Sequence, residues 1–172
     1  MTLPSFRRTA TVITLAGAIL ATPAAAYAAP VQQAANVQQR INAHLAAHPG
    51  GRQINKNEIS YGHGAFIMTF QTRQGPGVAA TGACPRGWFC FYPRSDFGGV
   101  YGKLSSCGWQ DLGWWNWRDK TQSAYYNLSR GSVIFYRDLN GRSEQIFALS
   151  TSARALPTVP FPKQADYVLR IC

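Results

Sequence analysis

The sequence is poor in acidic residues, histidine and cysteine. Its 172 residues include only 7 Asp and Glu against 17 Lys and Arg, with 3 His and 4 Cys. Charged residues make up 14% of the chain and aromatic residues 13%, which excludes a disordered polar tail and a coiled coil. No run of three cations occurs, so the chain lacks the basic stripe with interleaved aromatics that typifies nucleic-acid binding. We therefore expect one compact domain with no nucleic-acid partner.

The familiar catalytic motifs are also missing. His44 and His48 are four residues apart, but Leu45 stands where the HExxH motif has glutamate, so we interpret the pair as a solvated helix face. No Gly-x-Ser-x-Gly turn occurs, and the scattered acids single out no glycosidase pair. We therefore expect a binding protein without a cofactor, and not an enzyme.

Residues 1–28 have the layout of a secretory signal peptide. Arg7 and Arg8 precede an apolar run over 9–20, and small residues follow Pro23. We predict cleavage after Ala28, with cleavage after Ala26 as the alternative. The twelve-residue run is shorter than the roughly 20 residues that span a bilayer. We therefore expect a secreted, extracellular monomer that leaves the membrane after cleavage, with its net charge lowered from +10 to +8.

Beyond the leader, the chain changes character near residue 83. Residues 29–83 contain no Cys and no Trp, whereas residues 84–172 contain all of both. In the first segment, an apolar residue at every fourth position predicts a helix over 31–48, alternating residues predict one or two strands over about 58–71, and Gly and Pro indicate a linker up to residue 83. The sequence leaves open whether this N-terminal extension is a packed element, a leader removed later or a mobile tail.

The second segment, residues 84–172, alternates short apolar runs with turn residues. This spacing predicts an all-β, antiparallel sandwich or barrel. The expected strands lie in residues 99–104, 123–129, 132–138, 144–150 and 166–171.

The opening CPRGWFCFYPRSDFGG, the later SSCGWQDL, and the stretches RDKTQSAYYNLS and SVIFYRDLNG resemble the actinobacterial secreted peptidase-inhibitor family with a βγ-crystallin-like fold. The likeness covers roughly residues 55–172. It implies a double Greek-key sandwich over 84–172 and inhibition of extracellular peptidases, most of all metalloproteinases. The second hairpin departs from the pattern, because Phe135 and Gly141 are one residue closer than Phe91 and Gly98. The residues that carry the opening motif are Cys84, Pro85, Gly87, Cys90, Tyr92, Phe97 and Gly99.

Four cysteines in a secreted chain indicate disulfides. Of the three possible pairings we favour Cys84–Cys90, at the entry of the first hairpin, and Cys107–Cys172, which ties the middle of the domain to its last residue. A zinc site is disfavoured because the spacing is not CxxC and no histidine lies nearby.

Calcium is the metal that many βγ-crystallins bind, through acidic or amide residues followed by hydroxyl residues. Here the counterpart is 119–123, where Lys120 and Gln122 replace ligands and only Asp119 and Ser123 remain. We therefore expect no tight calcium site.

Candidate contact residues lie in two places. A loop pinned by a disulfide at Cys107, Gly108 and Trp109 is the first candidate for the inhibitory contact. Three tryptophans within four residues cannot all be buried on one strand, so at least one of Trp114, Trp115 and Trp117 is expected at the surface, beside Arg118. Exposed tryptophan with positive charge also suits an alternative function, a cationic module that binds cell-wall polysaccharide or acts against microbes.

Overall fold

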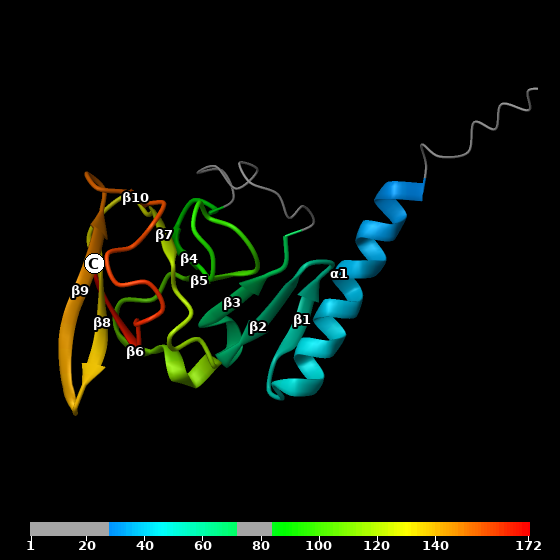
Figure 1. Cartoon of the computed structure of the whole chain (residues 1–172). Coiled ribbons are helices and arrows are strands. Elements are labelled where there is room, and N and C mark those ends of the chain that lie inside the picture. The colour runs from blue at the N-terminus through cyan, green and yellow to red at the C-terminus, as the bar shows by residue number, and fades with distance from the viewer. Residues whose placement is uncertain (1–27, 72–83) are drawn as a thin grey trace, which may run out of the picture.

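The structure is a computed structural model that describes residues 28–71 and 84–172, with side chains described from residue 36 onward. It contains two antiparallel sheets and one α-helix, α1. Figure 1 shows the sheets side by side and α1 beside the first three strands. The all-β prediction with a helical N-terminal extension is therefore confirmed. Residues 1–27 of the predicted signal peptide and the predicted linker, residues 72–83, lie outside the described residues.

Both segments of the chain build the larger sheet, whose strand order is β1-β2-β3-β5-β4-β7-β10. Strand β3 of the extension pairs with β5, with Met68 opposite Gly102. A side chain at residue 102 would lie 2.6 Å from the rings of Phe66 and Phe91, so glycine lets these rings meet across the sheet. The strands are β1 Arg52–Asn55, β2 Glu58–Tyr61, β3 Phe66–Thr69, β5 Tyr101–Leu104, β4 Trp88–Tyr92, β7 Ser123–Asn127 and β10 Ala155–Leu156.

The smaller sheet has the order β6-β11-β8-β9. Asn140 and Gly141 join β8 to β9 with φ angles of 55° and 80°, which are the left-handed angles of a two-residue hairpin turn. The shortened spacing leaves open whether the second hairpin is tightened or poorly formed; it is closed by a tight turn, and its ladder has an irregularity between Phe135 and Tyr136. The strands are β6 Gly108–Asp111, β11 Tyr167–Ile171, β8 Ser132–Leu139 and β9 Arg142–Ser150.

The first hairpin, after β4, is folded over and held by a side chain of β7. The buried Ser123 hydroxyl accepts a hydrogen bond from the Phe97 amide at 3.0 Å and donates one to the Arg94 carbonyl at 2.6 Å. Asp96 and Phe97 adopt left-handed φ angles of 53° and 59°. The two hydrogen bonds of Ser123 therefore hold this hairpin in a left-handed backbone conformation that residues other than glycine rarely adopt.

The core lies between the two sheets. Phe89 and Phe91 of β4 meet Phe135 of β8 edge to face, at 6.3 and 5.9 Å between ring centroids. Phe135 in turn stacks on Phe147 at 4.4 Å. Alternate residues of these strands point inward, so each strand contributes one apolar side chain per two positions to this layer.

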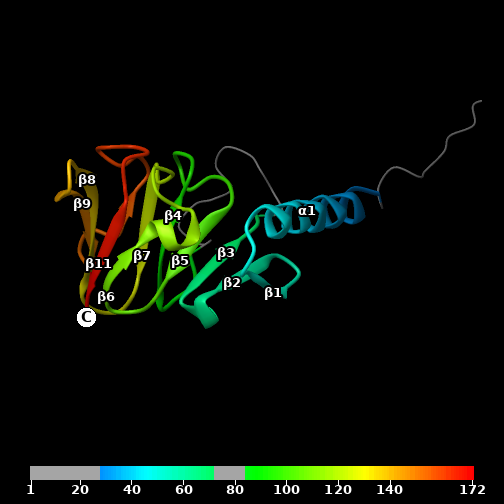
Figure 2. The same ribbon diagram turned by 90° about the horizontal axis from the view of Figure 1, so that it is seen from below.

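Helix α1 runs from Ala28 to Ala47, three residues earlier than predicted at its start. Val37 and Ile41 are buried in the same core cluster as the extension strands, and Leu45 packs against it. The helix lies at the end of the molecule away from the smaller sheet (Figure 2). Its four-residue apolar period therefore marks a packed face.

Some elements agree with the sequence-based expectation and others differ. The stretch 58–71 contains two strands separated by the 3-10 turn η1, Gly62–Gly64, and β3 is buried on both faces as expected. Strands β1, β6 and β10 were not predicted, because each is short and carries no alternating apolar pattern. No helix in the described part of the chain is long and apolar enough to cross a membrane.

Candidate functional site

The predicted contact residues lie on one continuous stretch at the start of the smaller sheet. Strand β6 begins at Gly108 and leads directly into the 3-10 turn η2, Leu112–Trp115. The Asp111 carboxylate caps this turn by accepting a hydrogen bond from the Gly113 amide at 2.6 Å. Asn116 ends it in a left-handed conformation. The chain therefore passes from an edge strand to a tight turn within nine residues.

Strand β6 is an edge strand, and its first end is covalently anchored. It pairs with β11 on one side only. Cys107 is bonded to Cys172, with 5.8 Å between their Cα atoms, so the bond joins the ends of two neighbouring strands. The Gln110 amide also donates a hydrogen bond to the Ser106 carbonyl at 2.9 Å. We call residues 106–110 the β6 edge; its backbone shape is fixed from both ends.

Trp109 stands on the outer face of this sheet, 44% exposed. Its ring contacts Tyr136 of β8 at 4.9 Å and stacks on Tyr167 of β11 at 5.5 Å between centroids. Strand register places it in one row with Leu169, Ile134 and Ala148, one residue from each strand. Register partners share a face, and the opposite face of the same strands is buried.

The outer face of an antiparallel sheet is usually polar, whereas this row is apolar throughout. We call Trp109, Leu169, Ile134 and Ala148 the apolar row. Trp109 and Ala148 are exposed and the other two are half-buried. An exposed apolar surface of this kind is typical of an interaction site.

Arg118 lies beside the apolar row but is fully engaged within the chain. Its guanidinium makes two hydrogen bonds to the Asp111 carboxylate, at 2.9 and 2.6 Å, and lies 5.0 Å above the Tyr167 ring. Burial raises the pKa of Asp111, but the hydrogen bonds from Arg118 and the Gly113 amide outweigh it, so the pKa lies below its ordinary value. Arg118 therefore holds the turn and the Tyr167 ring in place, and its charge is already paired with Asp111.

The three tryptophans of the turn have three different environments. Trp117 is 3% exposed and packs on Phe91, so it cannot contact a partner, and the expectation that it could is wrong. Trp115 is half-buried and stacks on Phe66 at 5.1 Å. Trp114 is 68% exposed. The prediction that at least one tryptophan lies at the surface is confirmed.

Sequence analysis missed Tyr136, Tyr167, Ile134 and Leu169. A signal for them exists, since β8 and β11 carry apolar residues at both odd and even positions, although their sheet covers the core with one face only. The second apolar set of such a strand must face outward.

The degenerate calcium stretch does not assemble a ligand set. The Ser123 hydroxyl is used in the first hairpin. Asp119 is largely exposed, and the slight desolvation of its carboxylate together with the charge of Asp166 raises its pKa. Within residues 28–71 and 84–172 no group of three His, Cys, Asp or Glu side chains is close enough together to hold a metal ion.

The expectation that His44 and His48 form a solvated helix face is wrong for His44. His44 is half-buried, with its ring 5.9 Å from Phe70 and 6.2 Å from Tyr61, so it is not part of a solvated face. His48 contacts the Asn116 amide at 3.2 Å. The end of the helix therefore touches the turn that follows β6.

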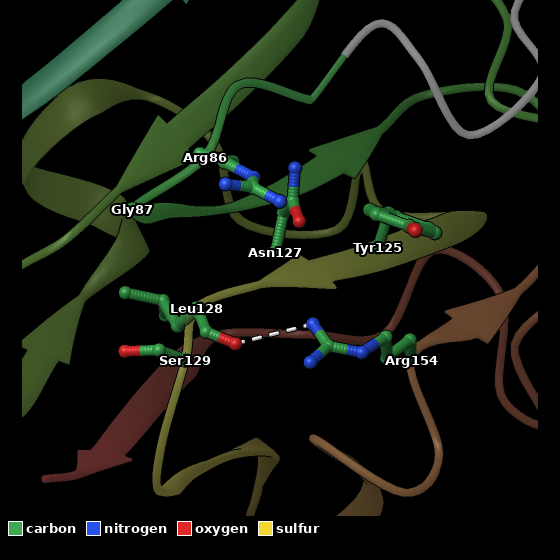
Figure 3. Close-up of a pocket in the computed structure, with 7 residues that line it drawn as sticks. All are labelled: Arg86, Gly87, Tyr125, Asn127, Leu128, Ser129 and Arg154. Carbon is green, nitrogen blue, oxygen red and sulfur yellow. Dashed lines mark hydrogen bonds between the residues drawn. The ribbon is translucent and has the colours of Figure 1, made fainter.

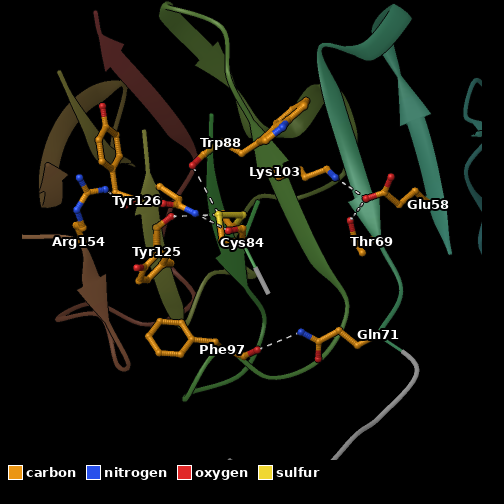
Figure 4. The surroundings of a disulfide bond; sticks show 12 residues. Glu58, Thr69, Gln71, Cys84, Trp88, Phe97, Lys103, Tyr125, Tyr126 and Arg154 are labelled. Carbon is orange, nitrogen blue, oxygen red and sulfur yellow. Dashed lines mark hydrogen bonds and ion pairs between the residues drawn. A yellow bond between two sulfur atoms is a disulfide. The ribbon is translucent and has the colours of Figure 1, made fainter. Parts of the chain in front are cut away.

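Cys84 is bonded to Cys90 across 5.7 Å between Cα atoms, so both disulfides join the pairs favoured from the sequence. Figure 4 shows its surroundings. The Asn127 amide donates a hydrogen bond to the Cys84 carbonyl at 2.8 Å, and the Gly87 amide donates one to the Asn127 carbonyl at 2.9 Å. The loop closed by this disulfide is thus bound to β7.

A comparison with protein-family models matches residues 78–148 to peptidase inhibitor family I36. The match covers β4 to most of β9, including the β6 edge, and it indicates a non-enzymatic inhibitor whose partner is a peptidase. No curated protein and no solved structure matches the chain.

Proposed function

We propose that this chain is a secreted inhibitor of extracellular peptidases, in particular metalloproteinases, and that it binds them through the β6 edge. One observation carries the location: an edge strand with an exposed tryptophan is pinned by a disulfide at its start. The family match supports the inhibitory role. The two disulfides fit an oxidising compartment, as does the predicted leader with cleavage after Ala28.

The free backbone edge of β6 supports substrate-like binding. A peptide often binds a protein by adding a strand to an exposed sheet edge, and β6 offers its unpaired side in that form. Trp109 supplies a large apolar side chain next to this edge. Aromatic anchors of this kind carry much of the binding energy in interfaces.

Anchoring at both ends lowers the cost of binding. An immobilised side chain costs about 0.5–1.5 kcal/mol when it is ordered on association, and the β6 edge is already ordered by Cys172 and by the hydrogen bond from Gln110 to Ser106. If a peptidase cuts the chain after Cys107, the disulfide and the pairing with β11 still hold both new ends. The segment then stays in the cleft and slows turnover.

The sheet order also supports the double Greek-key, βγ-crystallin-like arrangement for residues 84–172, because strands of the two hairpins exchange between the sheets. Strand β6 follows β5 in the chain yet lies in the other sheet, and β7 returns to the first. We propose this fold, with residues 29–83 as its N-terminal extension.

Inhibition assays test the proposal directly. Residues 29–172, refolded with both disulfides, are titrated into a thermolysin-type metalloproteinase and into a serine peptidase. We expect saturable inhibition of the metalloproteinase at micromolar protein or below. Absence of inhibition of both enzymes would contradict the proposed function.

A pair of variants tests the site. Trp109→Ala is expected to weaken inhibition by about tenfold or more, since a hot-spot aromatic contributes at least about 2 kcal/mol. Trp114→Ala removes a more exposed tryptophan outside the β6 edge and serves as the matched control. Equal effects of the two changes would argue against the β6 edge as the contact.

The cell-wall alternative is not favoured by the family match. Cosedimentation with chitin or peptidoglycan separates it from inhibition, because the proposed inhibitor is expected to stay in the supernatant.

A further inference from the structure

A pocket lies away from the β6 edge, between the loop closed by Cys84–Cys90 and the last residues of β7. Its volume is about 540 Å³, within the range of about 300–1,000 Å³ that small-molecule sites occupy. Arg86 and Gly87 lie on one side of the pocket, Leu128, Ser129 and Arg154 on the other, and Tyr125 and Asn127 between them (Figure 3).

The pocket carries two positive charges and no negative one. Arg86 and Arg154 both line it, and none of its lining residues is acidic. The Arg86 guanidinium makes no hydrogen bond or ion pair to any residue of the described chain, although the protein places Asp or Glu beside Arg118 and Arg137. Two uncompensated guanidinium groups facing one cavity attract an anion.

Arg154 is held in place by the backbone. Strand β10 is only two residues long, and next to it the Arg154 side chain donates hydrogen bonds to the carbonyls of Tyr126 and Leu128, both at 3.1 Å. These bonds use one guanidinium nitrogen and leave the other donors for a ligand. Fork-shaped donors fixed in this way match the oxygens of an anion.

Arg86 is positioned from the other side. It lies inside the six-residue separation closed by Cys84 and Cys90, and the neighbouring Gly87 amide is bonded to the Asn127 carbonyl. Gly87 has a φ angle of +84°, so the loop turns sharply beside the cavity. The backbone that carries Arg86 is therefore rigid even though its side chain is free.

The rest of the lining is mixed, with Leu128 and the Tyr125 ring apolar and Asn127 and Ser129 polar, and the pocket is larger than a phosphate group. The Asn127 side chain uses its amide nitrogen on the Cys84 carbonyl, which leaves its oxygen as an acceptor, and the Ser129 hydroxyl adds a donor and an acceptor. The geometry points to a site for a small organic phosphate, a phosphate monoester of a polyol, whose dianion meets the two arginines and whose hydroxyls meet Asn127 and Ser129. This site is independent of the proposed inhibition.

Titration of isotope-labelled protein with glycerol 3-phosphate at low ionic strength tests the site, with the Gly87 amide resonance as the local readout. Inorganic phosphate, acetate and glycerol are the comparison probes. We expect saturable shifts with glycerol 3-phosphate, weaker binding of inorganic phosphate and of acetate, and no binding of glycerol. Absence of shifts at Gly87, or inorganic phosphate binding as tightly as the ester, would overturn the proposal.

Arg86→Gln is the decisive variant, because Arg86 has no structural contact to lose. Its Kd for glycerol 3-phosphate is expected to rise by about tenfold, since a charge-assisted hydrogen bond is removed. Arg142→Gln removes the same charge from the exposed start of β9, outside the pocket, and is expected to change the Kd little. Equal losses in the two variants would show a general charge effect and overturn the site.

Discussion

Among the glycines that the structure describes, Gly131 is the one with least room for a side chain. Its φ angle is +80°, and a Cβ atom there would lie 2.0 Å from the Ile171 carbonyl oxygen. Gly141 has the same φ angle with open space around it. The two positions therefore differ only in how closely the backbone of Ile171 approaches the site of an added side chain.

We predict that Gly131→Ala lowers the free energy of unfolding by about 3 kcal/mol or more, because left-handed strain and overpacking add. Gly141→Ala is the matched control and is expected to cost only about 1 kcal/mol, from the left-handed conformation. Urea denaturation of both variants measures the difference. Equal losses would mean that strand β11 moves aside at no cost.

His44 makes the stability of the protein depend on pH. Burial, and then the charges of His48 and Lys120, lower the pKa of His44 from 6.5 to about 4. Between these two pH values the unfolded chain binds more protons than the folded one, so the free energy of unfolding falls as the pH falls. The contribution of His44 is present in full above pH 6.5 and is lost by about pH 4.

The measurement is urea denaturation from pH 6.5 down to pH 4, the range set by the shifted pKa. We predict that His44→Gln flattens the pH dependence, because it removes the titrating ring from beside Phe70 and Tyr61. His63→Asn, at an exposed position with a left-handed φ angle, should leave the slope unchanged. A wild-type slope in the His44 variant would refute the assignment.

At the residue scale, the sequence picks out candidate residues but does not predict how exposed each of them is. Trp114, Trp115 and Trp117 lie within four residues of one another, and one of them is 68% exposed while another is 3% exposed. Trp114 and Trp115 lie in the 3-10 turn η2 and Trp117 follows it, and such a short turn has no apolar period from which to read burial. The environment of His44 was predicted wrongly for a related reason, because its ring packs on Tyr61 of β2 and on Phe70, which follows β3.

At the scale of elements, the Cys107–Cys172 bond joins β6 to β11 and closes a separation of 65 residues. We predict that the double change Cys107→Ser with Cys172→Ser lowers the free energy of unfolding by about 4 kcal/mol through the loop entropy of the unfolded chain. It should also weaken peptidase inhibition more than this loss of folded protein explains, because the β6 edge loses its anchor. Denaturation and inhibition are measured on the same samples.

The other disulfide supplies the control for that experiment. Cys84→Ser with Cys90→Ser opens a separation of only six residues and leaves the β6 edge anchored. Its folded fraction is expected to inhibit like the wild type. If it loses inhibition as well, the contact lies near the first hairpin instead.

Most strands of the second segment could be predicted because apolar runs bounded by turn residues mark them, as in 132–138 and 166–171. Strand β6 could not be, since Gly108, Gln110 and Asp111 give it no apolar pattern and its position depends on pairing with β11. The candidate site shares this limit. Cys107 and Trp109 were selected from the disulfide, whereas Tyr136 and Leu169 join them only through the strand register.

At the scale of the whole molecule, the extension and the second segment form one continuous structure. Strand β3 pairs with β5, and the buried Lys103 ammonium of β5 forms an ion pair with Glu58 of β2 (Figure 4). Burial raises the pKa of Glu58, but hydrogen bonds from Lys103, Asn55 and Thr69 outweigh it and leave the pKa lowered. The carboxylate is thus charged in the folded state, and its ion pair with Lys103 links the extension to the second segment.

We therefore predict a single unfolding transition for residues 29–172. All five tryptophans lie in the second segment, so their fluorescence reports on that segment and, through Trp115 on Phe66, on its contact with the extension, whereas helical circular dichroism reports on α1, in the extension. Coincident transitions by the two probes indicate one cooperative unit. Glu58→Gln is expected to lower both midpoints together, because breaking a buried ion pair is strongly destabilising. A helical signal lost at lower temperature than the fluorescence change would instead show that the extension unfolds by itself.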